Sequence, residues 1–152
     1  MINTSKFPRS LLSLAAPLAL LLLASANLYA QQPMSISLNG SSVVPPVTTS
    51  AMGTGQIKVL PDHTVSGSIK VSGLVPTMAH IHEAAAGKNG PAIITLTKTT
   101  DDTFTVPADA KLTAARYKSY LAGKLYVSVR SAQYPNGEIR AQLLGEPMTL
   151  AH

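Results

Sequence analysis

The sequence predicts an all-β protein, an antiparallel sandwich or barrel that carries one short helix. Three observations favour this class: short segments in which apolar and polar residues alternate, glycines and prolines that separate these segments at regular intervals, and a single segment with helical periodicity. The 152 residues show no alternation of strands and helices of the kind that builds a parallel sheet. The length allows one domain rather than two.

The first half of the chain contains four predicted strands and one irregular segment. The paired prolines in residues 43–47 make that stretch an edge or irregular segment, because proline donates no backbone hydrogen bond. The turns expected here are residues 39–42 and the hairpin loop 61–63. The strands expected here are residues 34–38, 53–60, 64–71 and 77–83.

The second half of the chain is expected to hold the helix, directly before the last two strands. Thr113 can cap a helix over residues 114–121, and Gly123 supplies the left-handed residue that often ends one. Residues 84–91 are predicted to be a loop, because they contain two glycines, an asparagine and a proline. The strands expected here are residues 92–98, 103–106, 124–130 and 138–144.

The first thirty residues have the order of a secretory signal peptide. Lys6 and Arg9 precede an apolar run over residues 11–23, and small residues follow, with cleavage expected after Ala26 or Ala30. The run is shorter than the ~20 residues that a membrane-spanning helix needs. We therefore expect a secreted or periplasmic protein without an integral membrane segment after cleavage, comprising a domain over residues 31–144 and a tail over residues 145–152.

Composition and charge exclude several functions. The chain has no cysteine, which excludes a disulfide scaffold, a zinc ribbon and a thiol nucleophile. Its net charge of +5 falls to +3 without the signal peptide, which takes Lys6 and Arg9 and no acid with it. The remaining basic residues form no cluster or stripe, so a nucleic-acid partner is not expected.

The strongest chemical signal is the pair His80 and His82. Residues i and i+2 of a strand point to the same side, so two imidazoles at this spacing can converge on one metal ion, copper or another transition metal. The alternative is a solvated strand face on which both histidines are ordinary polar residues. A metal site needs further ligands, and spacing singles out none of the candidates: His63, Met78, Glu83, Glu138 and His152.

A second group of polar residues lies on the last two predicted strands. Glu138 and Arg140 share a strand face and can form an ion pair, with each other or with Arg130, at a possible surface site. Ser128 and Ser131 have no base with a supporting acid nearby, so a serine triad is not supported and no catalytic residue is assigned.

Several segments in a fixed order resemble the CHRD (chordin) domain. They are Leu-Asn-Gly at 38–40, Val-Pro-Pro-Val at 44–47, Ala-His-Ile-His at 79–82, Leu-Tyr-Val-Ser-Val at 125–129 and Tyr-Pro-Asn-Gly-Glu-Ile-Arg-Ala-Gln-Leu at 134–143. The resemblance covers nearly the whole chain after the signal peptide. It implies an exported protein with an antiparallel β-sandwich, of the immunoglobulin-like or copper/zinc superoxide dismutase-like Greek-key type.

The His-x-His strand is also similar to the copper-ligand strand of those dismutases. One departure bears on both resemblances: where the CHRD pattern usually has a histidine, in the strand after the helix, this chain has Arg130, a permanent cation that cannot bind a metal. Dismutase activity is therefore the least expected function. We expect a non-enzymatic binding module with an unidentified extracytoplasmic partner, or alternatively a metal-binding protein that uses His80 and His82.

Overall fold

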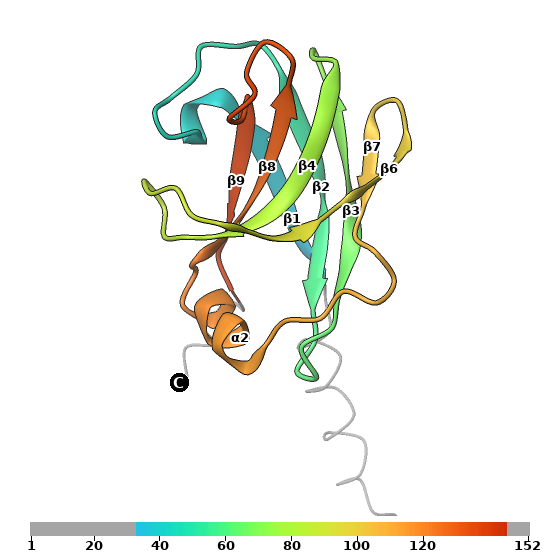
Figure 1. Cartoon of the computed structure of the whole chain (residues 1–152), viewed down its shortest axis with the longest axis vertical. Coiled ribbons are helices and arrows are strands. Elements are labelled where there is room, and N and C mark those ends of the chain that lie inside the picture. Colours follow the sequence, from blue (N-terminus) through green and yellow to red (C-terminus); the bar gives the residue numbers. More distant parts are fainter. Residues whose placement is uncertain (1–32, 146–152) are drawn as a thin grey trace, which may run out of the picture.

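The computed structural model describes residues 33–145 and has the antiparallel all-β architecture expected from the sequence (Figure 1). The predicted signal peptide and most of the predicted tail lie outside these residues. Within them, no helix is long and apolar enough to cross a membrane. The elements are β1 (Met34–Asn39), the 3-10 turn η1 (Gly40–Ser42), β2 (Met52–Val59), β3 (Val65–Ser72), β4 (Pro76–Glu83), β5 (Ala92–Thr95), β6 (Thr97–Thr100), β7 (Thr103–Thr105), α2 (Ala114–Leu121), β8 (Leu125–Ser131) and β9 (Ile139–Leu143).

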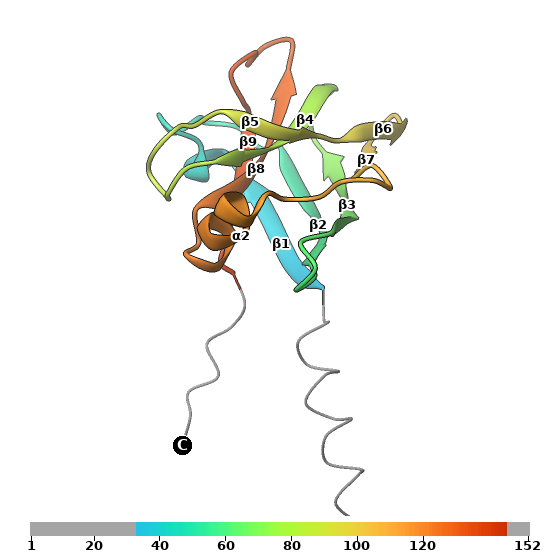
Figure 2. The same cartoon turned by 60° about the horizontal axis from the view of Figure 1, so that its bottom comes forward.

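All nine strands belong to one hydrogen-bonded sheet that curves towards a barrel. The strand order is β5-β4-β8-β9-β1-β2-β3-β7-β6, so the two outermost strands are consecutive in the chain. They run almost end to end (Figure 2), and the amide of Leu96 between them donates to the carbonyl of Ala79 in β4 at 2.9 Å. The antiparallel class is confirmed, while a division into two stacked Greek-key sheets stays a prediction.

The strand expected over residues 92–98 is divided in two by Leu96. The first part, β5, pairs with β4, and the second part, β6, pairs with β7. The change of partner takes place at Leu96, which is 4% exposed and belongs to the hydrophobic core. The β-branched and apolar residues of this segment could not reveal the break, because it depends on which strand lies beside each half.

The helix α2 begins and ends as predicted. The hydroxyl of Thr113 accepts a hydrogen bond from the amide of Arg116. At the other end Gly123 has φ +71°, and its amide donates to the carbonyl of Tyr120. The amide of Lys124 donates to the carbonyl of Ser119. This is the Schellman pattern, which satisfies the last free carbonyls of a helix.

The core lies on the inner side of the sheet. Along β8 and β9 the alternating residues Leu125, Val127, Val129, Ile139 and Leu143 are at most 1% exposed. The outer side of the same strands differs from the expected pattern, since Tyr126, Ser128 and Arg140 are buried too, and Arg130 and Gln142 are partly buried. Strands that are buried on both sides need a second covering layer, and here two loops provide it.

Candidate functional site

The predicted residues His80, Arg130 and Arg140 come together on the outer side of three neighbouring strands. In β4, β8 and β9, His80 lies opposite Ser128, which lies opposite Arg140. One step along, His82 lies opposite Tyr126, and Tyr126 lies opposite Gln142. We call this group the polar face; it comprises His80, His82, Tyr126, Ser128, Arg140 and Gln142, with Arg130 beside it on β8.

All members of the polar face except the partly buried Gln142 are buried, so the solvated strand face considered from the sequence is wrong. His80 is 6% exposed, His82 7% and Arg140 2%. The burial comes from tertiary contacts. Residues 84–91 fold back over one part of the polar face, and residues 40–50, which follow β1, lie over the neighbouring part on the same side of the sheet. Figure 1 shows both segments beside β8 and β9.

Three aromatic and cationic groups of the polar face form a stack. The ring of His82 lies parallel to that of Tyr126, with the ring centroids 4.8 Å apart, and the Cζ atom of Arg140 lies 3.5 Å from the Tyr126 centroid. Because β8 runs between β4 and β9, the tyrosine is held between the histidine and the arginine. Cation–π and stacking contacts of this kind fix side-chain orientation in a buried site.

Side chains of the polar face hold the loop of residues 84–91 by its backbone. The guanidinium of Arg140 donates to the carbonyls of Lys88 at 2.8 Å and Ala85 at 3.2 Å. The amide of Gln142 donates to the carbonyl of Ala84 at 2.8 Å. Arg140 is thus a buried cation whose acceptors are neutral oxygens, and burial lowers its pKa.

Gly90 lies at the end of the loop, where the sheet holds it from two sides. The Nδ1 atom of His82 lies 2.9 Å from the carbonyl of Gly90, and the amide of Gly90 donates to Oη of Tyr126 at 3.1 Å. A Cβ atom at Gly90 would lie 1.9 Å from the carbonyl oxygen of Glu83. Glycine is therefore required here by close approach of two backbone segments.

Residues 40–50 contact the loop of residues 84–91, and a pocket lies between these two segments. The side chain of Asn89 donates to the carbonyl of Val44 at 2.7 Å, and Thr49 donates to the buried carboxylate of Glu138 at 2.8 Å. The pocket has a volume of about 360 Å³. It is lined by Ser41, Ser42, Val43, Val44 and Pro46 from one loop, by Ala86 and Gly87 from the other, and by Arg140 and Gln142 from the sheet.

The two histidines carry unpartnered nitrogen atoms. A carbonyl oxygen only accepts, so Nδ1 of His82 holds the proton and its Nε2 keeps a free lone pair. That Nε2 and the Nδ1 of His80 are buried without a hydrogen-bond partner, as is Nε of Arg130. The ring centroids of the two histidines are 5.7 Å apart and their planes meet at 74°.

Burial and nearby cations disfavour the protonated form of both imidazoles. Burial is the largest effect that lowers the pKa of His80 below its ordinary 6.5, followed by the charges of Arg130 and His82. Burial also lowers the pKa of His82; the bond to Gly90 opposes this, while the charges of Arg130 and Arg140 add to it. Neutral imidazoles offer lone pairs, which is the state a metal ion requires.

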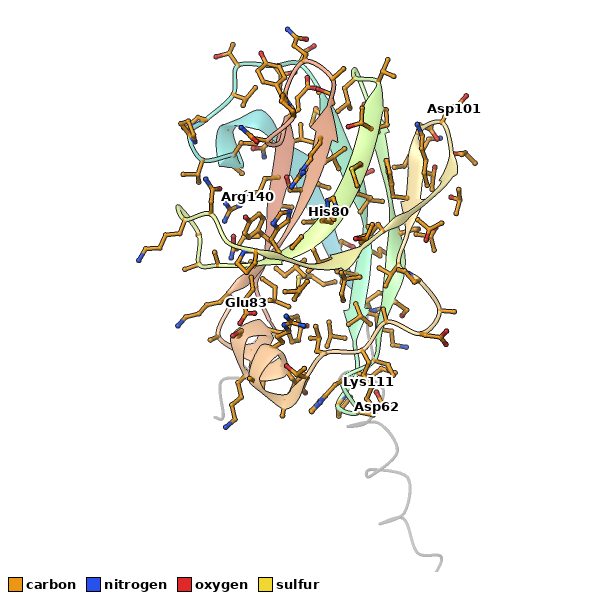
Figure 3. The ribbon with its side chains drawn as sticks, viewed as in Figure 1. Asp62, His80, Glu83, Asp101, Lys111 and Arg140 are labelled. Atoms are coloured by element: carbon orange, nitrogen blue, oxygen red, sulfur yellow. The ribbon has the colours of Figure 1, made fainter. Side chains whose placement is uncertain are left out.

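The other candidate ligands have different partners. His63 stacks on Tyr117 of α2 with ring centroids 4.3 Å apart, and Glu83 accepts from Ser119 of the same helix and pairs with Arg116. Figure 3 shows Glu83 between the polar face and α2. Met78 is 45% exposed, and His152 lies outside the described residues. Among residues 33–145, no three His, Cys, Asp or Glu side chains gather in a way that could hold a metal ion.

The surface site expected around Arg130, Glu138 and Arg140 takes another form. In residues 33–145 the ion pairs are Lys70–Asp102 and Arg116–Glu83, so the pairing of Glu138 with either arginine is wrong there. Glu138 bonds Thr49 and Arg140 bonds loop carbonyls instead. Sequence reasoning missed Tyr126 and Gln142, although their alternation with Val127 and Ala141 already placed them on the outer side.

The comparison with protein-family models matches the CHRD domain over residues 34–143. The chain belongs to the CHRD family. The matched range contains the whole polar face, both loops and the pocket of this CHRD domain. No curated protein and no solved structure shows a match to the chain.

In this CHRD domain Arg130 stands beside the histidine pair. It lies opposite Met78 on β4, two positions from His80, and its charge lowers the pKa of both imidazoles. Arg130 therefore places a permanent positive charge next to the two histidines.

Proposed function

We propose that this CHRD protein is an exported, non-enzymatic binding module, and that it binds its ligand at the pocket between residues 41–46 and 84–91. The observation that carries this proposal is the set of hydrogen bonds from Arg140, Gln142 and His82 to the backbone of the loop 84–91. These contacts use buried polar side chains to fix a surface loop. Loops held on a rigid β-scaffold are a common location of binding sites, and loops fixed in advance lose less entropy on binding.

The pocket suits a small ligand or a protruding side chain of a partner protein. Its volume of about 360 Å³ lies at the lower end of the range of about 300–1,000 Å³ for ligand sites. Val43, Val44 and Pro46 give it an apolar wall, while Ser41, Ser42, Arg140 and Gln142 add polar atoms to its lining. A few polar groups within a mainly apolar lining are typical of a site that orients its ligand.

Export is part of this proposal and rests on the order of residues 1–30. The mature protein is expected in the periplasm or outside the cell, with its first residue at Asn27 or Gln31. Intact mass measurement of the protein from the cell exterior and from the cell envelope tests this. A protein that keeps residues 1–30 and stays with the cytoplasm would contradict it.

Binding at the pocket can be tested by NMR with a fragment mixture of carboxylic acids, amino acids, sugars and short peptides. Amide shifts are expected in residues 41–46 and 84–91, and the fragment that causes them should be recovered chemically unchanged. Ala86→Trp fills the pocket and should abolish these shifts, while Ala115→Trp, on the exposed side of α2, is the matched control and should keep them. Shifts that persist in Ala86→Trp, or conversion of the fragment, would contradict the proposal.

A second candidate function is metal binding by His80 and His82, which the unpartnered nitrogens favour. A metal–nitrogen bond is about 2.0–2.1 Å and an imidazole nitrogen lies about 1.1 Å from its ring centre, so two rings on one ion have centres at most about 6.3 Å apart. The observed 5.7 Å is within that limit. The bond from Nδ1 of His82 to a backbone carbonyl is also the contact that metal-bound histidines usually make.

A further inference from the structure

We propose that the ligand of the pocket between residues 41–46 and 84–91 carries a carboxylate, and that the guanidinium of Arg140 binds this carboxylate. The inference rests on the proposed function, binding at this pocket, and adds the chemical class of the ligand: a carboxylic acid with a small apolar part.

Arg140 is a buried cation without a counter-ion in the described part of the chain. It is 2% exposed, and neither of the two ion pairs that residues 33–145 contain includes it. The carboxylate two positions away, Glu138, accepts from Thr49 instead. A charge that is removed from water is normally paired with an opposite charge, because its loss of hydration is costly. A bound anion would supply the opposite charge that Arg140 lacks.

The loop of residues 84–91 uses part of the guanidinium and brings no negative charge to it. Nη1 donates to the carbonyl of Lys88 at 2.8 Å and to Oδ1 of Asn89 at 3.5 Å. Nη2 donates to the carbonyl of Ala85 at 3.2 Å and to Oε1 of Gln142 at 2.8 Å. All four acceptors are neutral oxygens, and none of these bonds uses Nε, which is also a donor. The loop therefore fixes the position of the guanidinium but leaves its charge uncompensated.

The rest of the pocket suits an acid with one anionic group and a short apolar part. Its lining residues include Arg140 as a cation but no Asp or Glu that would repel an anion. Val43, Val44 and Pro46 offer apolar contacts beside this cation. Phosphate groups are commonly held by several backbone N–H groups at once, or by a fork of donors that is free to bind them. A lining with one cation, whose Nη atoms already hold the loop, favours a carboxylate over a phosphate.

The charge of Arg140 should distinguish an acid from an amide of the same shape. A hydrogen bond between two charged groups is about twice as strong as one between neutral groups, and burial reduces the screening of the charges by salt. We therefore expect a carboxylic acid to bind at least about tenfold more tightly than its amide.

The test compares acids with their amides by NMR titration of the protein as isolated from its cell. One pair is isovaleric acid and isovaleramide, and the other is acetyl-glycyl-leucine and its C-terminal amide. The acids should shift the amide signals of residues 41–46 and 84–91 and the Nε–H signal of Arg140. A preference for the acid in either pair supports the proposal, and the pair with the larger preference distinguishes a small acid from the end of a peptide chain.

Arg140→Gln tests which group provides the preference. This variant should lose the preference, so that acid and amide bind with similar affinity. Arg130→Gln is the matched control, because it makes the same substitution on the same side of the sheet at an arginine outside the pocket lining. It should keep the preference of the wild type. A preference that persists in Arg140→Gln, or that disappears in Arg130→Gln, would overturn the role given to Arg140.

The remaining outcomes separate this inference from the proposed function. An acid that binds to the wild type without shifting the Nε–H signal of Arg140 would overturn its role even where Arg140→Gln fails to fold. Equal binding of acid and amide, or binding of sugars alone from the fragment mixture, would overturn the carboxylate and leave the pocket as the binding site. The absence of shifts in residues 41–46 and 84–91 with every fragment would overturn the proposed function itself.

Discussion

Replacing Gly90 by alanine tests whether the polar face holds the loop 84–91 as described. The added Cβ would lie 1.9 Å from the carbonyl oxygen of Glu83, whereas ordinary contact begins at 3.4 Å. The loop must therefore move by roughly 1.5 Å, the difference between these two distances. Three hydrogen bonds cross this point: His82 to Gly90, Gly90 to Tyr126, and Glu83 to the carbonyl of Pro91.

The expected loss of stability follows from these contacts. Three hydrogen bonds at about 1 kcal/mol each give about 3 kcal/mol, and the lower entropy of an unfolded chain with alanine returns about 0.4–1 kcal/mol. We expect Gly90→Ala to lower the free energy of unfolding by about 2–2.6 kcal/mol, measured by urea denaturation. The Nδ1 proton of His82 should also lose its protection from exchange, measured by NMR.

Gly87→Ala is a matched control in the same loop. A Cβ at Gly87 meets no atom within 4 Å, but φ is +77°, so the substitution costs only the left-handed strain of about 1 kcal/mol. The Nδ1 proton of His82 should stay protected in this variant. A Gly90→Ala protein as stable as the wild type, or one less affected than Gly87→Ala, would refute the described close approach.

Three further predictions concern the polar face. The pKa values of His80 and His82 are lowered in the folded protein, so the unfolded chain binds protons first as the pH falls. The melting temperature should therefore decrease below about pH 6.5 and level off below the folded pKa values. The double variant His80→Gln, His82→Gln should show a smaller slope of melting temperature against pH. An unchanged slope would show that other groups are responsible. Tyr126→Phe removes only the hydroxyl that accepts from Gly90 and should lower the free energy of unfolding by about 1 kcal/mol in urea denaturation. Tyr126→Leu also removes the stack and should lower it by at least about 1 kcal/mol more. Equal losses in the two variants would mean that the stack contributes nothing. Arg140→Lys keeps the charge but loses the planar group, so hydrogen exchange in residues 84–91 should speed up by at least tenfold, and protection equal to the wild type would contradict the role given to the guanidinium.

Local periodicity was enough to predict the helix and the strands, except the division of residues 92–98 into β5 and β6. Alternation in residues 124–130 and 138–144 placed Val127 and Ile139 on one side and Arg140 on the other, because side chains of a strand alternate between its two sides. Thr113 and Gly123 marked the helix ends, since capping depends on residues within a few positions of each other. The shared side of His80 and His82 followed from the same rule.

Burial of that side could not be predicted, because it depends on contacts between distant segments. Whether a strand is covered by solvent or by a loop is not contained in its own alternation, and here residues 84–91 fold back onto β8 and β9. The hydrogen-bond partner of Arg140 could not be predicted from the sequence for the same reason. A nearby glutamate suggested an ion pair, but the guanidinium reaches the carbonyl of Lys88, 52 positions away in the chain.

The sequence by itself therefore determined the order of the elements, the family and the two histidines that share a strand face. The tertiary structure decided that this face is a buried layer with Tyr126 at its centre. It also decided that the charge of Arg130 lowers the pKa of the neighbouring His80. The physical reason is the range of the interactions. Propensity, alternation and capping act over a few residues, whereas burial, stacking and pKa shifts arise from groups that only the folded chain brings together.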